Sequence, residues 1–176
     1  MRKRTLLVAL STTAVLMLGI GLPASAAAVT TATVTVQGGS LSISAPASAG
    51  NLGSQPNSVG GEIISGPLGQ VQVTDARSAA AGSTWVASVI SSAFTPPAGP
   101  AIAASAVGYT AGVITKVGTA TYTADDPGNL TGVSPAVTAT GITGDNSATW
   151  NPTITVTVPG GMAAGIYSAT ITHSVV

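Results

Sequence analysis

The stretch Val71-Gln-Val-Thr-Asp-Ala-Arg77, followed by Ser83-Thr-Trp-Val-Ala87, contains the alternation on which the fold prediction rests. In the second piece, Trp85, Ala87 and Val89 occupy every other position. Side chains that are two residues apart lie on the same face of a β-strand. The two pieces therefore predict strands at residues 68–74 and 84–92, each with one face turned toward a core.

The same period of two recurs along most of the chain, and no segment shows helical periodicity with proper caps. Segments rich in Pro, Ser, Asn and Gly separate the candidate strands, at residues 45–61, 95–100, 125–129 and 143–146. The further strands are predicted at residues 31–36, 41–44, 62–64, 102–109, 113–123, 136–140, 149–158 and 166–175. We expect an all-β fold, a single immunoglobulin-like β-sandwich of short, mainly antiparallel strands.

The N-terminus has the features of a secretory signal peptide. A basic start at residues 2–4 precedes an apolar run over residues 6–22, which ends in Pro23 and Ala24-Ser-Ala26. An uncleaved membrane anchor is the alternative, because the run could nearly cross a bilayer. The Ala-x-Ala ending favours cleavage after Ala26, which predicts a signal peptide at 1–26, a mature domain at 27–176, and no stable membrane insertion after cleavage.

The mature chain is poor in charge and has no cysteine. It keeps two basic residues, Arg77 and Lys116, against five acidic ones, a formal charge of −3. Nothing in this composition could neutralise a row of phosphates, so nucleic acid is not expected as a partner. The lack of cysteine suits an exported bacterial protein that folds without disulfides. Abundant Thr and Ser predict contacts made by hydrogen bonds and apolar patches, with little dependence on salt.

Two distant segments together resemble the WxL family of Gram-positive surface domains. The family pattern is a Val-Thr-Asp-x-Arg strand, a nearby Trp-x-Leu, and a C-terminal Tyr-x-x-x-Leu-Thr-Trp-x-Leu. This chain has Val73-Thr-Asp-Ala-Arg77, then Trp85-Val-Ala87, then Tyr167-Ser-Ala-Thr-Ile-Thr-His-Ser-Val175. It is also similar to small secreted actinobacterial proteins that share Ser147-Ala-Thr-Trp-Asn-Pro152 and a Thr-His-Ser-Val ending.

The resemblance implies an all-β domain that is exported to the cell surface and attached non-covalently to peptidoglycan. The chain departs from the family pattern at two naming positions, where Ala87 replaces the Leu of Trp-x-Leu and His173 replaces the second Trp. The resemblance therefore applies more closely to the fold than to wall binding, because the alternation of the family pattern is kept while its second Trp is replaced by His173.

The C-terminal segment presents one apolar face. Tyr167, Ala169, Ile171, His173 and Val175 share one parity and project to the same side of a strand. If this face lies against the core, His173 requires a hydrogen-bond partner and is neutral. If the face lies outward, Tyr167 and His173 begin a binding strip.

Four aromatic or imidazole side chains are the candidate binding residues: Trp85, Trp150, Tyr167 and His173. Each indole either fills the core or stacks a ring face on a sugar. Asp75 and Arg77 are two residues apart and are predicted to form a structural ion pair on one strand face. Asp125, Asp126 and Asn129, with Asp145 and Asn146, carry the oxygen ligands that calcium prefers, but these residues also suit turns. We expect no metal and no cofactor.

Catalytic constellations are missing from the sequence. His173 is the only histidine, Glu62 has no obvious carboxylate partner, and no Gly-x-Ser-x-Gly motif occurs. We therefore expect a secreted, non-enzymatic protein at the bacterial cell surface, which binds peptidoglycan or another exported envelope protein. The alternative is a structural subunit or adhesion module that self-associates through uncharged edge strands, so an oligomer is compatible with the sequence.

Overall fold

A computed structural model describes residues 30–176, and the predicted signal peptide lies outside the described residues. Residues Val36–Val176 form one compact unit, and residues 30–35 belong to a separate one. The compact unit consists of two antiparallel sheets and one short 3-10 turn at Ala104–Ala106, which confirms the predicted all-β sandwich. The first sheet contains β1 (Leu41–Ser44), β3 (Val71–Ser91), β6 (Ser134–Trp150) and β5 (Thr115–Ala124) in that order, with β8 (Ile171–Val175) also paired to β3. The second contains β2 (Glu62–Pro67), β7 (Thr153–Val158) and β4 (Val107–Thr110).

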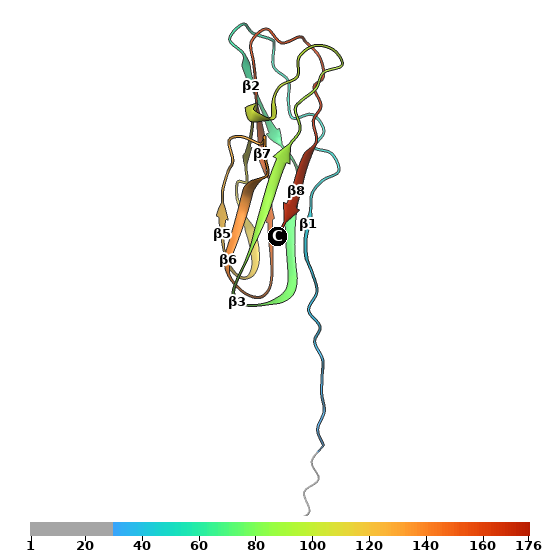
Figure 1. Ribbon diagram of the computed structural model, residues 1–176, viewed down its shortest axis with the longest axis vertical. Helices are drawn as coiled ribbons and strands as arrows, with labels where there is room; N and C mark the ends of the chain where they lie inside the picture. The colour runs from blue at the N-terminus through green and yellow to red at the C-terminus, as the bar shows by residue number, and fades with distance from the viewer. Residues whose placement is uncertain (1–29) are drawn as a thin grey trace, which may run out of the picture. The chain divides into compact units, whose positions relative to one another are not determined.

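The two longest strands, β3 and β6, bend together. They pair from Val71 opposite Trp150 to Val89 opposite Ser134, with register shifts near the middle. Asn146 lies opposite Asp75, yet its side chain accepts a 3.0 Å hydrogen bond from the indole of Trp85. In a straight strand, ten residues would separate these positions by roughly 30 Å. The ladder must therefore double back, as β3 does at its lower end in Figure 1, and its two halves form opposite layers of the sandwich.

The bend depends on residues that tolerate left-handed backbone. Ser78 in β3 and Gly144 in β6 have φ values of 53° and 69°. The carboxylate of Asp145 accepts a 2.9 Å hydrogen bond from the Ser78 amide, which secures the left-handed residue of one strand to the other. The turn predicted at residues 143–146 is wrong as a strand boundary, because these residues lie inside β6 and shape its bend.

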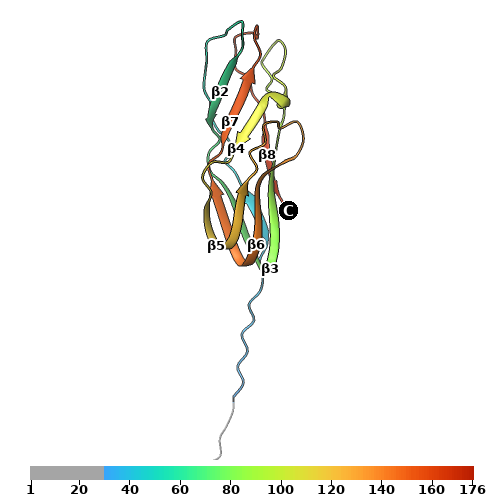
Figure 2. The same ribbon diagram turned by 90° about the vertical axis from the view of Figure 1, so that its left-hand side faces the viewer.

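The second sheet continues one layer of the first. β2 precedes β3, and β7 follows β6 after a break of only two residues. The amide of Leu68 donates a 2.8 Å hydrogen bond to the carbonyl of Pro152, which holds the two breaks together. Figure 2 shows β2, β7 and β4 side by side, with β7 paired to both neighbours.

The core lies between the layers and is filled by alternate residues of the paired strands. Its fully buried apolar side chains include Val71, Val73, Ala87, Val89, Val107, Leu130, Val137, Ile142 and Ile154. The C-terminal face of shared parity, from Tyr167 to Val175, also packs against this core. Of the strand predicted at residues 166–175, only Ile171–Val175 forms β8. The preceding part contains an isolated bridge between Thr95 and Ser168. Residues 31–36 form no strand, contrary to the prediction.

Candidate functional site

A buried polar cluster joins the two layers near the bend. We call it the Asp75 cluster; it contains Asp75, Arg77, Trp85, Tyr122 and Asn146. Arg77 donates to the Asp75 carboxylate from Nε at 2.8 Å and from a terminal guanidinium nitrogen at 2.9 Å. The Asn146 amide nitrogen donates to Asp75 at 3.2 Å, and its oxygen accepts from Trp85 at 3.0 Å and Tyr122 at 3.1 Å. Every side chain of the cluster is therefore hydrogen-bonded to at least one other.

Electrostatics fix the charge state of this cluster. The Asp75 side chain is fully buried, whereas the Arg77 side chain is 37% exposed. The hydrogen bond from the Arg77 guanidinium lowers the pKa of Asp75 from its ordinary 3.8, against the opposing effect of burial. The predicted ion pair of Asp75 and Arg77 is thus present, and it is half-buried. Through Asn146 it is linked by hydrogen bonds to Trp85 and Tyr122, so the network includes residues of both layers.

A second buried cluster lies where β4 meets the opposite layer. We call it the Tyr109 cluster; it contains Tyr109, Trp150 and His173. The Trp150 indole donates a 2.7 Å hydrogen bond to the Tyr109 hydroxyl, and Nε2 of His173 lies 3.2 Å from the same oxygen. The rings of Tyr109 and His173 are tilted by 59° with centroids 5.7 Å apart. One hydroxyl therefore connects two strands of the first sheet to one of the second.

One atom of the Tyr109 cluster has no partner. Nδ1 of His173 is buried and forms no hydrogen bond, the one such side-chain atom among residues 30–176. Burial lowers the pKa of His173 from its ordinary 6.5, and burial also raises the pKa of Tyr109. His173 is therefore neutral, and only one of its two ring nitrogens has a hydrogen-bond partner.

Both candidate indoles point into the core. Trp85 is 1% exposed and Trp150 is 2% exposed, so neither presents a ring face to a sugar in this structure. Tyr167 is half-buried and its hydroxyl donates to the carbonyl of Ala163. His173 and Tyr167 share a face, as predicted, and that face is turned toward the core.

Ala87 and His173 lie on paired strands of the first sheet. Ala87 is fully buried on the central strand β3, and β8 pairs directly beside it through Val175. His173 lies against the Tyr109 hydroxyl, which its ring nitrogen contacts.

Sequence reasoning did not identify Tyr109 and Tyr122 as members of these clusters, and it considered Asn146 only as a turn residue or a calcium ligand. Parity alone could have placed Tyr109 inward between Val107 and Ala111. Nothing local indicates that Tyr122 reaches Asn146, because that contact exists only once the ladder doubles back.

The proposed calcium ligands serve the backbone and neighbouring hydroxyls. Asp125 accepts from the Thr138 hydroxyl, Asp126 from the Ala111 amide and Asn129 from the Thr131 amide. Asp145 supports the bend and Asn146 belongs to the Asp75 cluster. No group of three or more His, Asp or Glu side chains is placed to hold a metal ion within residues 30–176.

The layer that contains β1 and the first half of β3 presents uncharged polar groups on its outward side. Residues opposite in parity to the buried Val71 and Val73 project from it, in two rows across four strands. We call this array the hydroxyl face; it contains Ser42, Thr74 and Ser147 in one row and Ser44, Gln72, Thr149 and Thr115 in the other. Val117 completes the first row, and no charged side chain interrupts either.

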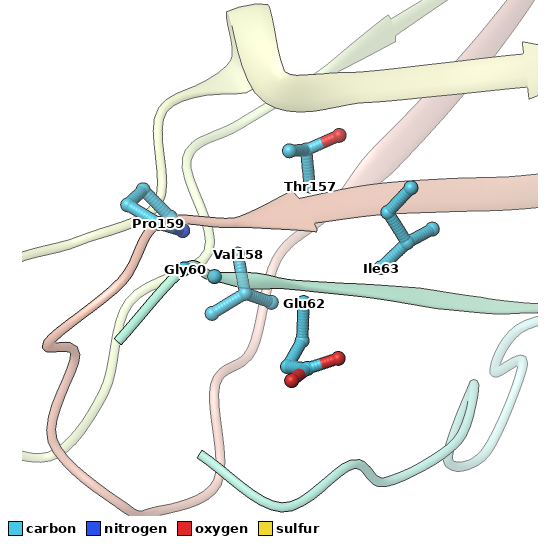
Figure 3. Close-up of a pocket in the computed structure, with 7 residues that line it drawn as sticks. Gly60, Glu62, Ile63, Thr157, Val158 and Pro159 are labelled. Carbon is cyan, nitrogen blue, oxygen red and sulfur yellow. The ribbon is translucent and has the colours of Figure 1, made fainter. Parts of the chain in front are cut away.

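Two shallow grooves lie on the second sheet. The larger, of about 550 Å³, is lined by Gly60, Gly61, Glu62, Ile63, Thr157, Val158 and Pro159 at the end of the β2–β7 pair. Figure 3 shows the Glu62 carboxylate on one side of this pair and Thr157 on the other. The smaller, of about 280 Å³, includes Tyr109, Asp126 and Thr155 in its lining. Neither groove brings together groups that could act as acid, base or nucleophile on one substrate.

Within the described part of the chain, no helix has the length and apolar character needed to cross a membrane. Comparisons with protein-family models, curated proteins and solved structures found no match to this chain.

Proposed function

We propose that the protein is an exported, non-enzymatic component of the bacterial cell envelope that attaches non-covalently to peptidoglycan through its hydroxyl face. The observation that carries this proposal is the array itself, two uncharged rows of Ser, Thr and Gln side chains on one side of a sheet. Such a surface can exchange hydrogen bonds with the repeated hydroxyl and amide groups of a glycan. The WxL resemblance, which implies wall attachment, points in the same direction.

The positions of the ionisable groups support the non-enzymatic part of the proposal. The Asp side chains accept hydrogen bonds from backbone amides, from a hydroxyl or from Arg77. The imidazole of His173 contacts Tyr109 through one nitrogen, and burial isolates the other. These groups stabilise the fold, and a general base for catalysis must instead reach a substrate proton.

Sedimentation with purified peptidoglycan tests the proposal. We expect protein that starts at Ala27 to pellet with the wall and to do so about equally at low and high salt, since few charges contribute. Thr74→Glu places a charge in the hydroxyl face and should release the protein into the supernatant. Thr140→Glu adds the same charge to an exposed threonine outside the hydroxyl face and should leave binding unchanged. Equal release of both variants, or no pelleting of the parent, would refute the proposal.

A second candidate function is self-assembly at the cell surface. The observation that favours it is that β8 is hydrogen-bonded along one edge only among the described strands, and that the strand carries no charged residue. Uncharged free edges invite the addition of another strand. Light scattering over a concentration series distinguishes the candidates, because an assembling subunit increases in mass with concentration whereas a monomeric wall binder does not.

A further inference from the structure

The inward face of β8 is incompletely covered. Ile171, His173 and Val175 point toward the core but are only half-buried, whereas the facing residues of the neighbouring central strand, Ala87 and Val89, are fully buried. β8 pairs with β3 on one side; β1 lies close to β8, but none of the described strands is hydrogen-bonded to its other side. A further strand at this edge would complete both the hydrogen-bond ladder and the cover over the apolar row.

The chain contains a segment with the pattern of such a strand. We call residues 30–37 the N-terminal arm. In the arm, Ala32, Val34 and Val36 alternate with threonines, and Val34 and Val36 are 91% and 85% exposed. β-branched residues in strict alternation favour extended pairing, with one apolar and one hydroxyl-bearing face. Exposed valines of this kind gain free energy when a sheet edge covers them.

The two glycines after the arm, Gly38 and Gly39, do not have the backbone of a tight hairpin. A two-residue Gly-Gly hairpin requires positive φ, and neither Gly38 nor Gly39 is among the described glycines with positive φ. The Gly39 amide instead donates to the Ala76 carbonyl at 2.5 Å, and the Ala76 amide donates to the Ser40 carbonyl at 3.1 Å. A Cβ on Gly39 would lie 2.9 Å from the Ala76 side chain, so these glycines permit close contact with β3.

The edges of β5, β4 and β2 are less suitable. β5 carries Lys116 and has a register shift beside Gly118, both of which discourage the addition of a strand. The outer side of β4 is occupied, since the Tyr109 amide donates to the Pro127 carbonyl. At β2, a Cβ on Gly66 would collide with the Leu52 carbonyl, which shows that a loop already covers this strand.

We propose that the N-terminal arm of one molecule adds as a strand to the free edge of β8 in a second copy of the chain. Main-chain hydrogen bonds supply the affinity, while Ala32, Val34 and Val36 cover the half-buried row of β8. The threonines of the arm then lie beside Thr172 and Ser174 on the outer face. Donor and acceptor are different surfaces, so the contact is head-to-tail and extends into chains. The inference rests on the self-assembly candidate and names its contact.

Light scattering of the protein that starts at Ala27 provides the first test. We expect its mass to rise with concentration to at least twice that of the monomer. The double variant Val34→Lys/Val36→Lys should remain monomeric at every concentration, because a charge cannot replace the valines over the core. Val59→Lys, which changes an equally exposed valine outside the arm, should assemble as the parent does. A circular dichroism spectrum identical to that of the parent shows that each variant is folded.

The absence of cysteine permits a direct test of the contact. Protein carrying Thr33→Cys is mixed with protein carrying either Thr172→Cys or Ser174→Cys, and mixed disulfides are identified by mass. We expect a disulfide with one of these β8 positions and none with Thr121→Cys on the exposed edge strand β5.

The outcomes separate the two ideas. Assembly that survives the lysine variant, or a disulfide at Thr121→Cys alone, overturns the role of the arm and of β8 but leaves self-assembly in place. A parent protein that is monomeric at all concentrations overturns both, and peptidoglycan binding then stands or falls by its own sedimentation test.

Discussion

The two buried clusters perform the same structural task with different completeness. The Asp75 cluster and the Tyr109 cluster each connect strands across the sandwich through hydrogen bonds of Trp and Tyr side chains. In the first, each buried polar atom of Asp75 and Asn146 has a partner, whereas the second leaves Nδ1 of His173 without one. Breaking a network in which every buried polar group has a partner lowers the free energy of unfolding strongly. Replacing a buried group that already lacks a partner lowers it little. The Asp75 cluster should therefore contribute more to the free energy of unfolding, and the Tyr109 cluster should make it depend on pH.

Asp75→Ala should have the largest effect. The substitution removes the acceptor of Arg77 and leaves the Asn146 amide nitrogen buried without a partner. Loss of hydrogen bonds to a buried charged group should lower the free energy of unfolding by about 3 kcal/mol, a value kept below that of a fully buried pair because Arg77 is partly solvated. Urea denaturation followed by tryptophan fluorescence measures it.

Arg77→Lys is the matched control for this prediction. It keeps the positive charge but loses the two-pronged contact, and we expect a loss of about 1 kcal/mol. An Asp75→Ala protein as stable as Arg77→Lys would show that the buried carboxylate is not the centre of the network.

Tyr109→Phe should have the next largest effect. Removing this hydroxyl leaves the Trp150 indole without its acceptor and Nε2 of His173 without its partner. We expect a loss of about 1–2 kcal/mol, since two buried groups lose a hydrogen bond while the ring volume is retained. A change below the error of urea denaturation would mean that solvent already reaches both groups.

Tyr122→Phe should have a smaller effect, in the cluster that is complete. Asn146 keeps its hydrogen bond from Trp85 when the Tyr122 hydroxyl is removed, so no buried group is left without a partner. We expect a loss of about 0.5–1 kcal/mol, again measured by urea denaturation. A larger loss than that of Tyr109→Phe would reverse the comparison, because the hydroxyl of the complete network would then matter more.

The sequence predicted the class of fold well and the internal contacts poorly. Alternation grouped Trp85, Ala87 and Val89 on one strand face, because parity along a strand is a local property, and that face is buried. It left open whether Trp85 fills the core or stacks on a sugar. It could not show that β3 and β6 are continuous through residues 76–84 and 141–145, where Gly and Ser indicate a turn equally well. The partners of Trp85 and Trp150 follow from that bend and from the pairing of β4 with β7, which are long-range features.

In the N-terminal arm the sequence predicted a strand that does not form, whereas in β6 it predicted a turn where the strand continues. Residues 31–36 have a clear strand pattern, yet they form no strand, because pairing requires an edge as well as a propensity. The pattern describes what the segment can do when an edge is present, and it is the basis for proposing a second molecule as the source of that edge.

The dependence of stability on pH should separate the two clusters with the smallest perturbation. Burial lowers the pKa of His173 below 6.5, so its contribution to stability is complete above pH 6.5 and is lost as the pH falls through the pKa of the folded state. The hydrogen bond from Arg77 lowers the pKa of Asp75 below 3.8, so the Asp75 contribution is kept down to pH 3.8 and lost only below it. Between these two values, the Tyr109 cluster should weaken while the Asp75 cluster does not.

Urea denaturation across that interval, compared with the His173→Leu variant, measures this difference. Leucine removes both the titrating group and the buried atom without a partner, so the variant should be about as stable as the parent above pH 6.5. Its midpoint should change less than that of the parent as the pH falls toward 3.8, because no imidazole remains to gain a proton. Parallel curves for the two proteins would place the pH sensitivity outside the Tyr109 cluster and would show that His173 gains its proton without opening the fold.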